Sequence, residues 1–213
     1  RIEGTQVAIV AGPAGEEIHP DKYGRIKLWF PWDRKAKKDG TDTCWVRVAQ
    51  SWAGSTWGGQ IIPRIGMEVM VAYVDGDPDR PLVTGVVPNP ANSVPYDLPA
   101  NKTKSVFRTQ THKGVGFNEM TFEDEAGREE IYMHAQRDFT TKVENHATER
   151  VDANKIVSVG GMSLVEIERS STQNVAQNLS LNVGSGSFGN IISGEARLDV
   201  FGMRPPVISS AVH

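Results

Sequence analysis

Hydrophobic and polar positions follow two different patterns along the chain. In its first part, short runs rich in β-branched and aromatic residues are separated by turn-forming residues, a pattern typical of short β-strands. The runs lie at residues 5–11, 24–30, 44–50, 67–74 and 82–87. No helical period accompanies them. These five short strands predict a closed OB-fold barrel, because closure removes exposed strand edges.

The second part carries a repeat of eight residues. A valine or isoleucine recurs seven times in succession at this spacing, at Val143, Val151, Val159, Ile167, Val175, Val183 and Ile191. Eight is neither the heptad nor the eleven-residue repeat of supercoiled helices. It is an even number, so in a β-strand the repeated side chain returns to the same face. The repeat therefore predicts extended chain with one apolar face.

The length of the repeat predicts how that apolar face is covered. Eight extended residues span roughly 26 Å, about one wall of a triangular coil whose facing walls are about 10 Å apart. A lone chain would leave the apolar face open and its backbone groups unpaired. Three chains wound together supply three walls. The pattern predicts an intertwined, trimeric triple-stranded β-helix with the seven Val and Ile residues on its axis. A single-chain coil with three repeats per turn stays open as an alternative.

Composition and charge narrow the function classes. The 213 residues are 38% hydrophobic and 23% charged, and 23 basic against 26 acidic residues give a formal charge of −3. Neither half is basic, which argues against a nucleic-acid partner. One cysteine excludes an internal disulfide framework and a multi-cysteine zinc site. This residue, Cys44, stands beside Trp45 at a strand start, where we expect a small buried hydrophobe.

The distribution of proline predicts the domain boundaries. The segment from 100 to 204 contains no proline, whereas the region around 88–103 is rich in it and reads as a semi-extended connector. We therefore expect four parts. They are an OB-fold domain at 1–90, a connector or neck at 91–130, the eight-residue-repeat β-helix at 131–191, and a C-terminal tip or segment of artificial origin at 192–213.

Candidate chemical sites are weak, and we predict no enzyme, no cofactor and no metal. Asp75, Asp77 and Asp79 resemble the start of a calcium loop, but Arg80 stands where glycine is needed, so a hairpin tip is favoured. The stretch GSGSFG at 184–189 fits a dinucleotide fingerprint without its strand and helix. Neighbouring glutamates (Glu16 and Glu17, Glu129 and Glu130) would point to opposite faces of a strand.

Histidines and tryptophans leave two alternatives open. Any histidine on a threefold axis could cage a metal, and the histidines considered are His112, His134, His146 and His213. The five tryptophans are Trp29, Trp32, Trp45, Trp52 and Trp57. Tryptophans on an OB fold can stack bases or sugars, but at alternating strand positions they are more often core. The alternative function is thus an oligonucleotide- or glycan-binding OB module with a β-rich oligomerising tail.

Several motifs in order resemble the VgrG family, the spike proteins of bacterial type VI secretion, which are related to the central spikes of contractile phage tails. They are GRIKLWFPWDR (24–34), CWVRVAQSWAG (44–54), WGGQIIPRIGMEV (57–69), GDPDRPLVTGVV (76–87), LPANKT (98–103), FNE (117–119) and IYMHAQRD (131–138). The resemblance covers roughly residues 2–183. It implies a ring-forming base before Arg1, then an OB fold, then a triple-stranded β-helix. The glycine that the phage relatives favour two residues after each repeated valine is present only as Gly161.

The resemblance also implies a function. We expect a rigid homotrimeric spike that a contracting machine drives through a target-cell membrane to deliver effectors. The expected partners are two further copies, a tube protein at the base, and a cap protein or effector at the tip. Such a protein is loaded in the bacterial cytoplasm and expelled from the cell.

Overall fold

The computed structural model describes residues 1–184, and the prediction of an all-β chain is confirmed. Its elements are β1 (Thr5–Ala11), β2 (Lys27–Trp29), β3 (Arg47–Val48), β4 (Glu68–Tyr73), the 3₁₀ turn η1 (Val74–Gly76), β5 (Pro81–Val87), β6 (Lys104–Gln110), β7 (Phe117–Glu123) and β8 (Glu130–His134). Across these described residues, no helix has the length and apolarity that crossing a membrane requires.

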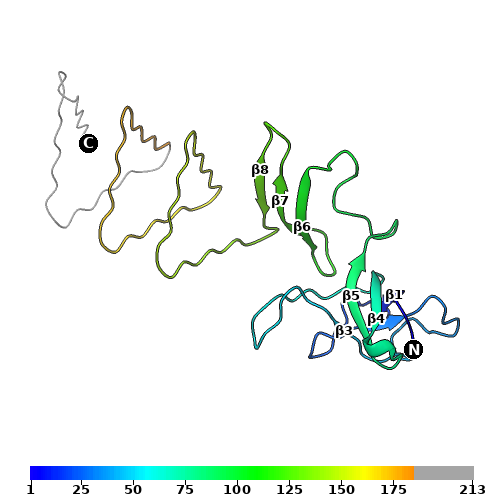
Figure 1. The fold of residues 1–213 in the computed structure, drawn as a ribbon. Helices are drawn as coiled ribbons and strands as arrows, with labels where there is room; N and C mark the ends of the chain where they lie inside the picture. The colour runs from blue at the N-terminus through cyan, green and yellow to red at the C-terminus, as the bar shows by residue number, and fades with distance from the viewer. Residues whose placement is uncertain (185–213) are drawn as a thin grey trace, which may run out of the picture. The chain divides into compact units, whose positions relative to one another are not determined.

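Strands β1 to β5 form one five-stranded sheet in the order β2-β1-β4-β5-β3, with β3 and β5 parallel and the other pairs antiparallel. Its two end strands meet through a bridge between Ile26 and Val46, whose backbone groups exchange hydrogen bonds of 2.9 and 2.8 Å. The sheet therefore closes on itself. It lies near the N-terminus in Figure 1. This order and closure define the predicted OB-fold barrel.

The barrel core is aliphatic. Alternate residues of the strands point inward, as the two-residue period of a strand requires. The fully enclosed side chains are Ala8, Val10, Ile26, Leu28, Val46, Val69, Val71 and Val83. Each Val, Ile or Leu buried in this way contributes about 1.5–3 kcal/mol relative to exposure. The barrel thus encloses these eight apolar side chains within a single chain.

Two predictions about the barrel are wrong. Cys44 is exposed, not buried, because it precedes β3 in the loop that ends at the Ile26–Val46 bridge. Three of the tryptophans, Trp32, Trp52 and Trp57, are not core either, because they are 65%, 66% and 56% exposed, whereas Trp29 and Trp45 are partly buried. Trp52 and Trp57 instead pack edge to face, with ring centroids 4.9 Å apart, in an exposed loop.

The region expected to be a connector, 91–130, contains structure that the sequence did not reveal. Strands β6, β7 and β8 form a three-stranded antiparallel sheet, and β8 extends past residue 130 into the range expected for the β-helix. Contacts with the barrel hold the turn between β6 and β7. Lys113 forms an ion pair of 2.9 Å with Glu16, and its backbone N–H donates to Glu17 at 3.1 Å. Arg64, which pairs with Glu17, also donates to the carbonyl of Gln110.

The chain divides into two compact units, Arg1–Ala147 and Thr148–His213. The second unit is described from residue 148 to residue 184, where the chain is extended and winds in wide, open turns (Figure 1). This part contains no strand partner: no strand is assigned between residues 148 and 184.

Candidate oligomerisation surface

The repeated Val and Ile residues share one environment along the described chain. Their exposed fractions are 50% at Val143, 46% at Val151, 50% at Val159, 53% at Ile167, 45% at Val175 and 45% at Val183. We call these six residues the ladder. Ile191, which was predicted to continue it, lies outside the described residues.

Among the large apolar residues of 148–184, those of the ladder have the smallest exposed fractions. Every other one is more exposed, from 68% at Leu164 to 90% at Ile156. The narrow spread within the ladder shows that one period of eight residues returns each side chain to the same setting. All of them nevertheless keep about half of their surface in solvent. In a protein surrounded by water, a row of half-exposed apolar side chains of this kind marks a surface that needs a binding partner.

The backbone of this segment is also unpaired. From residue 137 to residue 184, the end of the described chain, no backbone–backbone hydrogen bond forms. Backbone N–H and C=O groups that become buried need partners, and an extended chain finds them on neighbouring strands. Successive turns of the same chain do not supply those partners here. An extended backbone without backbone hydrogen bonds among the described residues and a half-exposed apolar ladder thus coincide in one segment.

Charged residues of the segment pair locally. Lys142 contacts Glu144 at 2.6 Å, and Arg150 contacts Asp152 at 2.9 Å, with all four side chains at least four-fifths exposed. Exposed pairs of this kind contribute only about 0–1 kcal/mol each. These pairs therefore do not hold the segment together.

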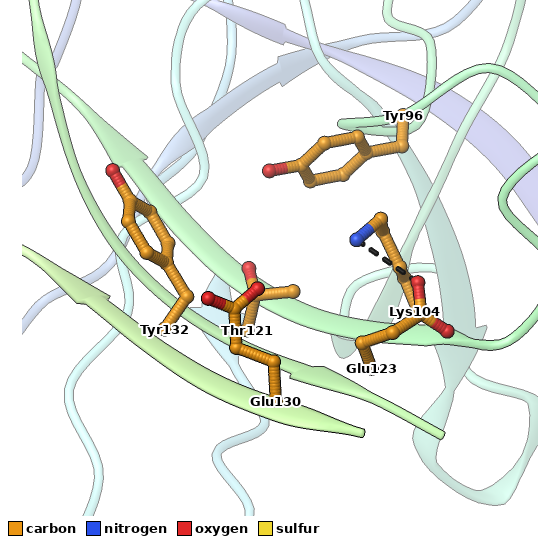
Figure 2. A pocket seen from close by; sticks show the side chains of 6 residues that line it. All are labelled: Tyr96, Lys104, Thr121, Glu123, Glu130 and Tyr132. Carbon is orange, nitrogen blue, oxygen red and sulfur yellow. Dashed lines mark ion pairs between the residues drawn. The ribbon is translucent and has the colours of Figure 1, made fainter. Parts of the chain in front are cut away.

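The sheet β6–β7–β8 has a covered polar face. Glu119, Thr121 and Glu123 alternate along β7 and are 5%, 3% and 8% exposed. Glu119 accepts hydrogen bonds from the Tyr96 hydroxyl at 2.6 Å and from the Thr121 hydroxyl at 2.9 Å. Arg108 Nε lies 3.4 Å from its second oxygen. Figure 2 shows the neighbouring pocket, in which Lys104 pairs with Glu123 at 3.0 Å.

These contacts shift the pKa values of the carboxyl groups. Burial alone would raise the pKa of Glu119, but hydrogen bonds from Tyr96 and Thr121 and the charge of Arg108 outweigh it and lower the pKa. The hydrogen bond from Thr103 and the contact with Lys104 lower the pKa of Glu123 to about 2. Both carboxylates are therefore charged near neutral pH and stabilise the covered face in that state.

The remaining predicted site residues are dispersed. Asp75, Asp77 and Asp79 lie in the turn between β4 and β5, where Asp75 pairs with Arg80 at 3.0 Å and Asp77 accepts the Asp79 N–H at 3.0 Å. Within residues 1–184, no group of three His, Cys, Asp or Glu side chains could hold a metal. Two of the calls, His213 and most of GSGSFG, lie outside the described residues.

The histidines that the structure describes have different settings. His134 ends β8, is partly buried and contacts the Phe117 carbonyl at 3.0 Å through Nδ1. His112 and His146 are exposed.

The fold and this surface define a class of protein: a closed OB barrel followed by an extended repetitive segment with a half-exposed apolar ladder. Residues 9–87 match the model of the type VI secretion system/phage-baseplate injector OB domain. Residues 105–204 match that of the bacteriophage T4 gp5 C-terminal trimerisation domain. The second match continues past residue 183, where the resemblance found in the sequence ended.

Curated relatives agree with both matches. The chain is 50% identical over 159 residues to the actin cross-linking toxin VgrG1 of Vibrio cholerae, over 149 residues to the type VI secretion system spike protein VgrG3 of the same species, and over 167 residues to the spike protein VgrG5 of Pseudomonas aeruginosa. These alignments cover 75%, 70% and 78% of this chain. The chain belongs to the VgrG family of type VI secretion spike proteins.

The chain corresponds to a limited part of these relatives, because the alignments cover 14%, 15% and 21% of their lengths. One relative is named as a toxin, whereas the other two are named as spike proteins. The family assignment favours a spike over the oligonucleotide- or glycan-binding module that the sequence left open.

Proposed function

We propose that this chain forms the barrel and shaft of a homotrimeric, cell-puncturing spike of type VI secretion. The observation that carries the proposal is the ladder: an evenly spaced row of half-exposed apolar side chains, along a stretch from residue 137 to residue 184 whose backbone forms no backbone hydrogen bond with any other described residue. Two further copies would supply both the apolar cover and the missing hydrogen bonds. The match to a trimerisation domain over residues 105–204 supports three copies.

The single-chain alternative is less well supported. A coil that closes on itself needs hydrogen bonds between successive turns of the same chain, as in any sheet. None joins residues 137–184, the last part that the structure describes.

We place the seven repeated residues on the trimer axis, with residues 131–191 as the shaft. Within the ladder, facing Val and Ile side chains would exclude water and give up the half of their surface that is now exposed. Each strand of the shaft would then have a neighbour on both edges. A rod built in this way cannot lose one strand without breaking two rows of hydrogen bonds, so it resists buckling under an axial load.

The proposed mechanical role of the barrel and shaft needs no catalytic group. A contracting machine supplies the free energy, and the shaft transmits it to a target membrane. The proposed partners are a tube protein at the base and a cap protein or effector at the tip. The proposed route is loading in the bacterial cytoplasm followed by expulsion.

A matched pair of substitutions tests the proposal. Val159→Asp places three carboxylates in a dry axis, and uncompensated buried charges cost several kcal/mol each. Ile156→Asp adds the same charge at a side chain that is 90% exposed and lies at an odd offset from the ladder. Sedimentation should show a monomer for Val159→Asp and a trimer for Ile156→Asp. A trimer for both variants would mean that the ladder does not face the axis.

A further inference from the structure

The sheet β6–β7–β8 carries an apolar face that the isolated chain leaves in solvent. Strand pairing aligns Phe107, Met120 and Met133 in one row and Phe122 with Ile131 in the next. Residues directly opposite each other on paired strands point to the same side of a sheet. The five side chains are between 38% and 65% exposed. We call these five residues the neck face.

The sheet that carries the neck face exposes the opposite side from an ordinary surface sheet. A sheet with one solvated side normally buries its apolar residues and exposes its polar ones. Here the polar side, with Glu119, Thr121 and Glu123, is the covered one. Tyr96 binds Glu119, Lys104 pairs with Glu123, and Arg108 lies beside the second Glu119 oxygen, so the sheet cannot turn over to bury its apolar side without losing these contacts.

The ladder raises a separate problem of register. Its residues recur every eight positions, so a chain that slips by eight residues again places Val or Ile opposite Val or Ile. A repeat with one kind of apolar residue specifies strand register weakly. Three intertwined chains therefore need a non-repeating contact to align them. The neck face provides a mixed pattern of Phe, Met and Ile that occurs once in the described residues.

We infer that the neck face packs against the same face of two further copies and thereby sets the register of the ladder. The inference rests on the homotrimer proposed above. Its occupant is a second copy of this chain, for three reasons. The trimerisation-domain match begins at residue 105, inside β6. The chain runs on from β8, which ends at His134, to the first ladder residue, Val143, so the two surfaces are continuous along it. The five side chains of the face and the polar residues beside them (Ser105, Thr109 and Asn118) carry no charge. Asp138 lines the hollow beside Phe107 and Met120, but it pairs with Arg137 at 3.3 Å, so its charge is compensated when identical copies meet.

Cysteine labelling tests whether the face is covered. The exposed Cys44 is first replaced by serine, and single cysteines are then introduced by Met133→Cys or by Val115→Cys, whose parent side chain is 98% exposed. In the trimer, a maleimide should react with the Met133→Cys variant at least about tenfold more slowly than with the Val115→Cys variant, because only local opening would expose it. Adding Val159→Asp, which separates the copies, should remove that difference. Equal rates in a verified trimer would overturn the inference.

Cross-linking tests the register. Two chains in the Cys44→Ser background, one with Val159→Cys and a longer tag and the other with Ile167→Cys, are co-expressed and oxidised. Aligned chains should form disulfides between identical positions only. When both chains also carry Met133→Glu, disulfides between positions 159 and 167 should appear, whereas Val115→Glu should leave the pattern unchanged. The absence of mixed disulfides with Met133→Glu in a trimer would show that the ladder finds its register without the neck face.

The two proposals fail differently. A monomeric parent chain would overturn the trimer and the neck together. A trimer whose neck cysteine reacts freely, or whose register survives Met133→Glu, would overturn only the role of the neck face.

Discussion

The barrel and the ladder segment differ in how their apolar residues are buried. The barrel closes its five strands on an aliphatic core, with Val69, Val71 and Val83 fully enclosed. The ladder segment spaces its apolar residues so that the described chain covers only about half of each side chain. The first region is complete as one molecule, whereas the second is one third of a structure. Similar residue types thus lead to a domain or to an assembly, depending on whether the strands can pair within the chain.

The largest expected effect is a loss of the trimer that leaves the barrel folded. Ile167→Asp should convert the trimer to monomers and leave the barrel folded, because the ladder contributes nothing to the barrel core. All five tryptophans lie between residues 29 and 57, so their emission reports the barrel alone. Light scattering should show the loss of the trimer while the tryptophan spectrum stays unchanged. A coupled loss of both signals would show that the barrel depends on the assembly.

The converse substitution affects the barrel first. Leu28 is 1% exposed in the core, and Leu28→Ala should destabilise the barrel by about 2–5 kcal/mol through lost burial and a cavity. Denaturation followed by tryptophan emission measures this change. The trimer mass in the absence of denaturant should not change. If Leu28→Ala had no effect on the midpoint, the assigned core would be wrong.

How well the sequence predicts each region depends on whether a residue makes its contacts within the same chain. The strands at 5–11 and 67–74 were predictable because runs rich in β-branched residues lie between turn-forming residues, and part of each run is buried within the chain. The eight-residue repeat was visible because it is periodic, although its axial placement is still a prediction. Cys44 was misjudged because a strand-like neighbourhood does not reveal where a strand begins.

The sheet β6–β7–β8 was missed for a physical reason. Its apolar residues face solvent and its carboxylates are covered, so the usual association of polar residues with solvent does not hold. A signal was nevertheless present. Phe107, Met120 with Phe122, and Ile131 with Met133 follow a two-residue alternation. Glycine-containing turns separate these runs, and Gly127 in the second turn adopts a φ of 79°.

Acid should weaken the sheet more than the ladder. Because the folded-state pKa of Glu123 is about 2, below its ordinary value of 4.5, its stabilising contribution is full above pH 4.5 and is lost as the pH falls towards 2. The ladder residues do not titrate. The parent should therefore be more stable than Glu123→Gln at pH 7, and the difference should shrink as the pH approaches 2. Denaturation midpoints at several pH values measure it, and a gap that does not depend on pH would contradict the assignment.

The smallest effect is expected at exposed ion pairs of the second unit. Arg150 and Asp152 have side chains that are 86% and 82% exposed. Arg150→Ala should change the free energy of trimer dissociation by no more than about 1 kcal/mol, and added salt should reduce that change further. A large loss would mean that this pair is buried between copies.

The most direct test of the central claim is the mass of the unmodified chain in solution, measured by light scattering over a range of concentrations. The account predicts three times the chain mass of 23.3 kDa, with no dissociation at micromolar concentration. A stable monomer of 23.3 kDa with a folded barrel would contradict it.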